Sequence, residues 1–369
     1  MPGQELTPVQ AERQRQRRRR FTRPGFVMQI ALLLCLLAGP LIWPSFRVMD
    51  LVAKIMIFAV VVASFDIILG YTGIISFAHG MFFGLGAYSL ALVCHHTPSP
   101  QYYHLLLAGA TAALISSTVA VVISALSLRV KAIFFAMVTL AVAEFCHILG
   151  YQWSSLTMGE DGISFKLPGI FGVDWSGGSL WGTQINGRLT VYYLILVACV
   201  LLFVGLVRFV RSPVGRVLKA VRDNEQRAIA LGYRVFRYRV LSTVFGSLVS
   251  SLGGVLFAMW LRYVNPDTVL GTSLMLTLLL MVIIGGLGTV YGGILGAAFI
   301  KTAETWLPDL QKLAKSLFPQ APLVQRLAER WILIFGILYI LVVLFFPKGV
   351  VGSLRDWAER RRLSQAGRG

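Results

Sequence analysis

Residues 212–233 mix basic, acidic and small side chains at a spacing that predicts a short capped helix. Pro213 stops the preceding helix. Asp223 or Asn224 can cap a new helix, and Gly232 can end it. Such a helix provides a rigid projection to which a partner protein can bind. The alternative is a solvated basic loop that serves only membrane topology, but such a loop would need neither the acidic residues nor the Ala-x-Ala-x-Gly stretch found here.

A second segment, residues 70–88, gathers glycines, hydroxyls and a histidine inside an apolar stretch. Irregular backbone at membrane depth is tolerated only where protein or a water-filled path covers it. The segment therefore predicts a helix break that borders a cavity. Close helix packing through small residues is the alternative, and it explains Gly84 and Gly86 better than it explains the hydroxyls. The candidate path-lining residues in this segment are Gly70, Tyr71, Thr72, Gly73, Ser76 and His79.

Ionisable residues inside apolar runs are functional candidates because their desolvation is costly. Five such residues occur: Lys54, Asp66, His79, Glu144 and His147. Glu144 and His147 are three residues apart and can share a hydrogen bond on one helix. Structural pairing between helices is the alternative for all five. If one of them gates a path, His79 is the first candidate because it lies in the glycine-rich break.

The sequence contains no recognisable catalytic or metal-ligating set. The five histidines have no HExxH spacing, and Cys35, Cys94, Cys146 and Cys199 form no CxxC pair. The phosphate-binding pattern Gly-x-x-x-x-Gly-Lys-(Ser/Thr) is also absent. We therefore expect no enzyme, no catalytic residue and no bound cofactor. Any energy for transport has to come from another subunit or from an ion gradient.

Composition identifies the elements that position these residues. Hydrophobic residues make up 56% of the 369 residues and charged residues 14%, against about 25% charged in soluble proteins. We predict an all-α polytopic membrane protein with about ten transmembrane helices. Three of these spans are short or broken by glycine, and if one pair is re-entrant the number changes. The expected spans are residues 26–43, 48–69, 81–94, 104–128, 132–150, 189–207, 240–261, 273–287, 290–303 and 331–346.

The net charge of +18 is concentrated in four segments. Residues 1–24 carry +5, Arg129 and Lys131 add +2, residues 208–239 carry +7 and residues 348–369 carry +4. With ten spans all four fall on one side, which the positive-inside rule makes cytoplasmic. This distribution excludes a nucleic-acid-binding surface as the source of the basic charge.

The basic loop resembles the coupling loop of permease subunits of ABC importers for branched-chain amino acids, with the related urea and short-chain amide permeases. The match runs without a gap from Gly215 to Gly232. Further similarity lies in residues 134–144, 285–297 and 344–352, so that it covers most of residues 48–352. The residues that this resemblance assigns to docking on an ATPase are Arg222, Asp223, Asn224, Glu225, Arg227, Ala228 and Gly232. Thr139 and Glu144, which lie in the similar segment 134–144, are added to the candidate path-lining residues.

The resemblance implies the ABC importer permease fold in a bacterial inner membrane. Residues 1–25 and 347–369 would be basic cytoplasmic tails around a transmembrane permease domain, residues 26–346. Its loop 208–239 would be the cytoplasmic coupling loop, and loops 151–188 and 304–330 would be periplasmic.

The implied partners are a second permease subunit in a heterodimer, two cytoplasmic ATPase subunits that use the ATP, and a periplasmic substrate-binding protein. Branched-chain amino acids are the first expected substrate, and urea or short-chain amides are the alternative. The acidic pair Glu160 and Asp161 departs from many relatives and leaves this choice open. An ion-coupled secondary transporter is the alternative function.

Overall fold

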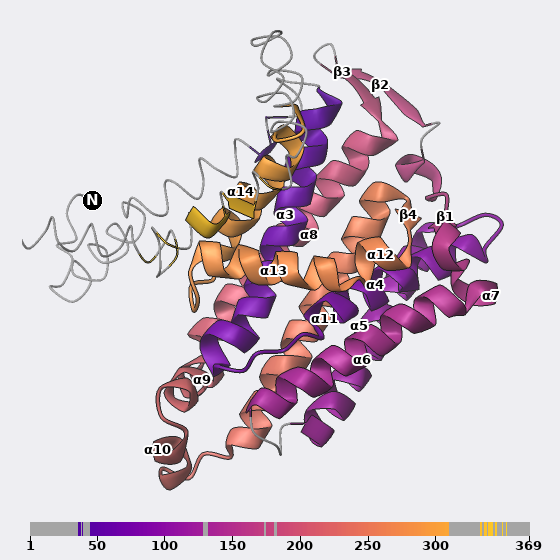
Figure 1. Ribbon diagram of the computed structural model, residues 1–369. Coiled ribbons are helices and arrows are strands. Elements are labelled where there is room, and N and C mark those ends of the chain that lie inside the picture. Colours follow the sequence, from indigo (N-terminus) through magenta and orange to yellow (C-terminus); the bar gives the residue numbers. More distant parts are fainter. Residues whose placement is uncertain are drawn as a thin grey trace, which may run out of the picture.

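The computed structural model describes residues 45–127, 132–172, 175–180 and 183–309, with isolated positions between 36 and 39 and between 333 and 352. Apart from these isolated positions, the first and tenth expected spans and both expected tails lie outside the described residues, as does most of loop 304–330. Figure 1 shows a bundle of long helices, with the short helices α9 and α10 and the strands β2 and β3 near opposite ends.

Eight long helices correspond to the second to ninth expected spans. In the described part of the chain, five of them are long and apolar enough to cross a membrane, and a sixth candidate span, Pro266–Gly285, consists of α13 and the short helix before it. Helices α4 with 17 residues, α13 with 14 and α14 with 15 match the spans that the sequence predicts to be short or broken by glycine. The chain is thus an all-α, multi-pass membrane protein, as predicted. The helices are α3 (Phe46–Asp66), α4 (His79–His95), α5 (Tyr102–Ser127), α6 (Ala132–Gln152), α8 (Gly187–Arg211), α11 (Val235–Leu261), α13 (Thr272–Gly285) and α14 (Gly292–Trp306).

Short elements join these helices. Two small antiparallel sheets involve the loop between α6 and α8: β1 pairs with β4, and β2 forms a hairpin with β3. The remaining elements are η1, a π-helix (Ile67–Tyr71), α7 (Ser154–Thr157), η2 (Gly159–Asp161), β1 (Ile163–Ser164), η3 (Gly169–Phe171), β2 (Ser176–Leu180), β3 (Thr183–Asn186), α9 (Pro213–Asp223), α10 (Glu225–Ala230), β4 (Tyr263–Val264) and α12 (Pro266–Val269).

The core is built around α3, α4 and α11. The rings of Phe58, Phe83 and Phe257 meet there, with centroids 5.2–5.8 Å apart. Small residues let the backbones of α4 and α11 approach closely, because a methyl group on Gly86 would overlap the Ser251 backbone. Helices α5, α6 and α8 pack against this core, and only a minority of their residues are buried.

The described loops gather at the two ends of the bundle. At one end, Arg222 of α9 donates a hydrogen bond to the Gly70 carbonyl, and the amide of Gly288 donates to Asp66 at 2.7 Å. At the other end, Arg262 donates to the Phe171 carbonyl at 2.7 Å. Loop 208–239 is therefore at the end opposite to loop 151–188. This is the alternation that consecutive spans require.

We expect Gly86→Ala to destabilise the protein, because the added methyl group forces α4 and α11 apart. Overpacking of this kind costs about 1–3 kcal/mol. The matched control is Gly109→Ala on α5, where the nearest atom to an added methyl group is 4.0 Å away. Thermal unfolding in detergent should show a lower midpoint for Gly86→Ala only. Equal midpoints for the two variants would contradict this packing.

Candidate functional site

The loop between α8 and α11 folds into two capped helices. Ser212 caps α9, accepting a hydrogen bond from the Gly215 amide at 3.4 Å, and Pro213 occupies the first helical position. Asn224 has an extended backbone, and its side-chain oxygen accepts a bond from the Arg227 amide at 2.9 Å. Asn224 is therefore the cap of α10, while Asp223 ends α9. Both features follow the local signals in the sequence.

Gly232 reverses the chain after α10. Its φ of +85° lies in the left-handed region, which glycine adopts without steric cost. The amide of Gly232 donates to the Ile229 carbonyl at 2.9 Å, and that of Tyr233 donates to the Ala228 carbonyl at 3.2 Å. These bonds close the last turn of α10 before α11 begins at Val235.

Packing and charge fix the orientation of α10. Ala228 is buried in a small cluster with Val221 of α9 and Val235 of α11. Glu225, the first residue of α10, accepts two hydrogen bonds from Arg239 of α11, both at 2.8 Å. A two-pronged contact of this kind restrains direction as well as distance. The helix pair is thus a rigid projection from the bundle (Figure 1).

Four large apolar side chains are exposed around the end of α10. Leu231 is 70% exposed, and Ile229, Tyr233 and Phe236 are between 40% and 56% exposed. We call these four residues the docking tip. Exposed apolar patches mark interaction sites. The sequence analysis did not select any of them, because nothing in a chain so rich in apolar residues distinguishes those that remain uncovered.

The residues that the resemblance assigns to docking have different positions in this loop. Asn224, Glu225, Ala228 and Gly232 build its conformation. Asp223 and Arg227 are exposed on its surface, whereas Arg222 reaches back to Gly70. Their part in docking stays a prediction.

The glycine-rich segment forms a helix break, as expected. Helix α3 passes into the π-helix η1, and Gly73 has a φ of +73° before α4 begins at His79. The amide of Ile74 donates to the Ile68 carbonyl at 3.3 Å. The amide of Phe77 donates to the Thr139 hydroxyl at 3.0 Å, which ties the break to α6.

His79 is fully buried beside α3. Its Nε2 lies 2.9 Å from the hydroxyl of Ser64, whose own proton goes to the Val61 carbonyl at 2.7 Å. Nε2 therefore donates, and Nδ1 carries a lone pair without a partner among the described residues. The His79 ring packs on Phe65 with centroids 5.0 Å apart. These contacts support the structural pairing account for this residue.

The candidate path-lining residues divide into two groups. Gly73 is exposed, and Glu144 has 45% of its side chain exposed. The others, buried around the break in this conformation, are Gly70, Tyr71, Thr72, Ser76, His79 and Thr139. The structure thus brings Thr139 to the break but leaves Glu144 apart from it. A path-lining role for these residues stays a prediction.

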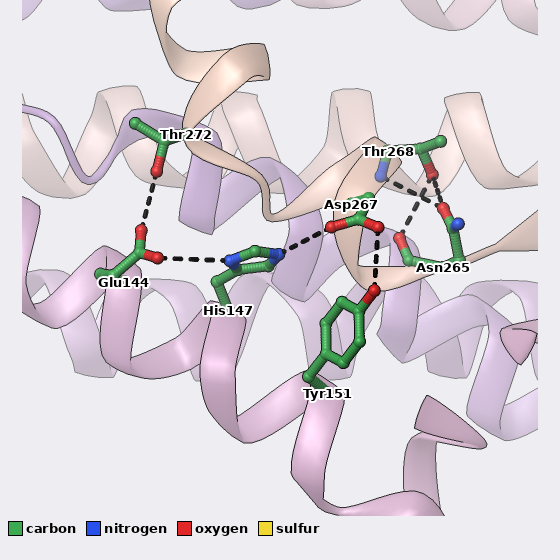
Figure 2. A network of polar contacts seen from close by, with 7 residues as sticks. All are labelled: Glu144, His147, Tyr151, Asn265, Asp267, Thr268 and Thr272. Carbon is green, nitrogen blue, oxygen red and sulfur yellow. Dashed lines mark hydrogen bonds and ion pairs between the residues drawn. The ribbon is translucent and has the colours of Figure 1, made fainter. Parts of the chain in front are cut away.

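Glu144 belongs to a polar network between α6 and the segment that contains α12 and α13 (Figure 2). Its carboxylate lies 3.5 Å from His147 Nδ1 and accepts a hydrogen bond from Thr272 at 2.7 Å. His147 Nε2 lies 3.1 Å from Asp267, which also accepts from the Tyr151 hydroxyl at 3.2 Å. Glu144 and His147 are therefore neighbours as predicted, at an ion-pair distance rather than in a hydrogen bond. The sequence analysis missed Asp267 on α12.

The network joins α6 to α12 and α13 and remains accessible. Asp267 has 58% of its side chain exposed. Asn265 caps α12 by accepting from the Thr268 amide at 3.1 Å. The pattern Asn-Pro-Asp at residues 265–267 predicts a helix start. Nothing in the sequence indicates that Asp267 contacts His147, which lies 120 residues earlier.

Lys54 and Asp66 also have partners. Lys54 pairs with Asp50 one turn earlier at 2.8 Å, and the Trp260 indole donates to the same carboxylate at 2.8 Å. Asp66 accepts from the Gly288 amide. Among the described residues no group of three or more histidine, cysteine or acidic residues could hold a metal ion.

Comparison with known proteins relates the chain to transport permeases. A family profile described as "Branched-chain amino acid transport system / permease component" matches residues 47–344. The chain is 25% identical over 346 residues to the high-affinity branched-chain amino acid transport system permease protein LivM of Salmonella typhimurium, covering 89% of this chain and 76% of LivM. It is 24% identical over 307 residues to BraD of Pseudomonas aeruginosa, with coverages of 80% and 91%. It is 23% identical over 253 residues to LivH of Escherichia coli, with coverages of 67% and 80%. No solved structure matches the chain.

We expect Asn224→Ala to loosen α10, because one helical amide loses its cap. The loss of a cap costs about 1 kcal/mol, which raises the equilibrium constant for local opening of α10 roughly fivefold. Hydrogen exchange of the α10 amides measures this directly. Asn224→Asp retains the acceptor oxygen and should exchange like the unaltered protein. Unchanged exchange in Asn224→Ala would show that the cap does not hold the helix.

Proposed function

The chain belongs to the family of branched-chain amino acid transport permeases, and we propose that it is one of two permease subunits of an ABC importer driven by partner ATPases. The observation that carries this proposal is the rigid projection of α9 and α10, which ends in an exposed apolar tip. The permease role itself follows from the family. The partners, the substrate and the roles of individual residues are parts of the proposal.

The projection has the properties of a docking element for an ATPase subunit. Leu231 and its three apolar neighbours alternate in the sequence with the exposed basic residues Arg227, Arg234 and Arg237. An apolar centre with a charged rim is the usual anatomy of a protein interface. Because α10 is held to both α9 and α11, a push on the tip acts on the spans behind it. We assign this end to the cytoplasm from its basic charge.

The polar network on α6 supports a path between two permeases. Glu144 lies about 18 Å from the start of α6 and about 12 Å from its end, well inside the expected membrane. An exposed carboxylate at that depth is costly in lipid. We therefore place this face of α6 against a water-filled path and a second permease. The two kinds of relatives, named LivM and LivH, support a heterodimer.

The remaining assignments are parts of the same proposal. Loops 151–188 and 304–330 face the periplasm and receive substrate from a binding protein, whereas residues 1–25 and 347–369 are cytoplasmic. The membrane is the bacterial inner membrane. ATP is bound and hydrolysed only by the partner subunits.

The substrate is a branched-chain amino acid, on the strength of what LivM, LivH and BraD are named for. Uptake of labelled leucine, in competition with isoleucine, valine, urea and acetamide, tests this assignment. Competition by the amino acids alone supports it. Competition by urea or acetamide alone would replace it with the amide class.

We expect Leu231→Asp to abolish ATP-dependent uptake by the assembled importer, because a carboxylate in an apolar contact removes the central anchor. Truncation of a central apolar contact costs about 2 kcal/mol or more, or at least roughly thirtyfold in affinity. The measurement is uptake by proteoliposomes, together with co-purification of the ATPase subunits. Leu231→Met retains an apolar side chain and should behave normally. Normal uptake by Leu231→Asp would count against the docking role.

We expect a cysteine at position 144 to react with a membrane-impermeant thiol reagent. The variant is Glu144→Cys in a chain whose four native cysteines have been replaced. Leu114→Cys is the matched control, because Leu114 is an apolar residue that lies midway along α5 and is 70% exposed. Labelling at position 144 alone supports a water-filled path. Equal protection of both positions would contradict it.

A further inference from the structure

Helix α9 contacts the helix break through two residues. The guanidinium Nη1 of Arg222 donates a hydrogen bond to the Gly70 carbonyl. Lys219, one turn earlier, places its Nζ 4.9 Å from the centroid of the Tyr71 ring. A methyl group added to Gly73 would lie 3.3 Å from the aliphatic part of Arg222. The break therefore contacts α9 directly. We call the pair of helices α9 and α10 the docking projection.

The position of Gly70 explains why a guanidinium binds there. Gly70 lies in the last turn of the continuous helix formed by α3 and η1, which ends at Tyr71. Carbonyls in the last turn of a helix have no helical partner, and the helix dipole makes that end negative. A cation bonded to such a carbonyl is favoured on both grounds.

Asp66 lies near the same helix end, and one of its two carboxylate oxygens accepts no hydrogen bond from the described residues. It is 1% exposed. The backbone amides of Gly288 and Thr289 face its carboxylate, and Gly288 donates to Oδ1 at 2.7 Å. The other oxygen, Oδ2, is buried and has no hydrogen-bond partner among the described residues. A buried acceptor without a partner costs free energy.

Glycines keep Arg222 and Asp66 close together. A methyl group on Gly70 would overlap the Asp66 carboxylate and the Gly288 amide. One on Gly288 would lie 2.9 Å from the Arg222 Nη1. The absence of a side chain at both glycines thus leaves room beside the guanidinium and the carboxylate.

We propose that Arg222 and Asp66 are positioning residues that transmit movement of the docking projection to the helix break. Arg222 has two candidate acceptors beside the break: the Gly70 carbonyl, which it holds in this structure, and the unused Oδ2 of Asp66, with which it forms no ion pair here. Exchange between them gives α9 two positions relative to the break, each with its own charge-assisted contact. This inference rests on the proposed function, since the ATPases supply the movement.

The geometry suits arginine better than lysine. A guanidinium has five N–H donors in a planar fork and can contact a carbonyl and a carboxylate at once during the exchange. An ammonium is a compact, strongly hydrated charge. Arg222→Lys should therefore retain only part of the function.

The experiment uses the complete importer in proteoliposomes and measures two rates, substrate uptake and ATP hydrolysis. Arg222→Ala and Asp66→Asn should each lower the ratio of substrate taken up to ATP hydrolysed by about tenfold. Arg222→Lys should give an intermediate ratio. Arg216→Ala is the control, because Arg216 is an exposed arginine on the same helix outside the break contacts. It should keep the original ratio.

A double variant separates transmission from simple loss of stability. If the two residues act as one unit, the double variant Arg222→Ala with Asp66→Asn should lower the ratio of uptake to ATP hydrolysis no further than either single change. Thermal unfolding of each variant provides the folding measurement, and Arg222 is an exposed side chain whose removal leaves the core intact.

The outcomes distinguish this inference from the proposed function. If Leu231→Asp stops uptake while Arg222→Ala and Asp66→Asn keep the original ratio, docking is supported and transmission through this pair is wrong. Fully additive losses in the double variant would likewise overturn it. If Leu231→Asp and the break variants all transport normally, the coupling role of the projection itself fails.

Discussion

Backbone polar groups cannot be left unpaired where water is excluded, and the helix break and the neighbouring turn between α13 and α14 meet this requirement through three side chains. Arg222 donates to the Gly70 carbonyl, Asp66 accepts from the Gly288 amide, and the Thr139 hydroxyl accepts from the Phe77 amide. These bonds come from α9, α3 and α6. The irregular backbone thus holds three distant parts of the chain together.

The same requirement explains the distribution of charge. Most ionisable groups within the described spans are paired, such as Lys54 with Asp50 and Lys301 with Glu304, each at 2.8 Å. The polar network of Glu144, His147 and Asp267 is different, because it is hydrogen-bonded and yet exposed. In lipid this would be unfavourable, which is why we propose that another protein or water replaces lipid at this face of α6.

Much of the fold and half of the site could be predicted from the sequence, because their signals are local. Apolar runs indicate the spans, and Asn224 and Gly232 indicate the ends of α10 through rules that act within a few residues. The contact of Arg222 with Gly70 joins positions 152 residues apart, and no spacing rule encodes it. The docking tip was missed for another reason: exposure of Leu231 depends on how the whole bundle packs.

The central claim is that ATP hydrolysed by partner subunits drives transport through this chain. The most direct measurement is substrate uptake by proteoliposomes that contain the importer purified through this chain, with its binding protein supplied outside and every ion gradient collapsed. The account predicts uptake that requires ATP on the side of the docking projection and is insensitive to ionophores. Uptake that needs an ion gradient and proceeds without ATP would contradict it.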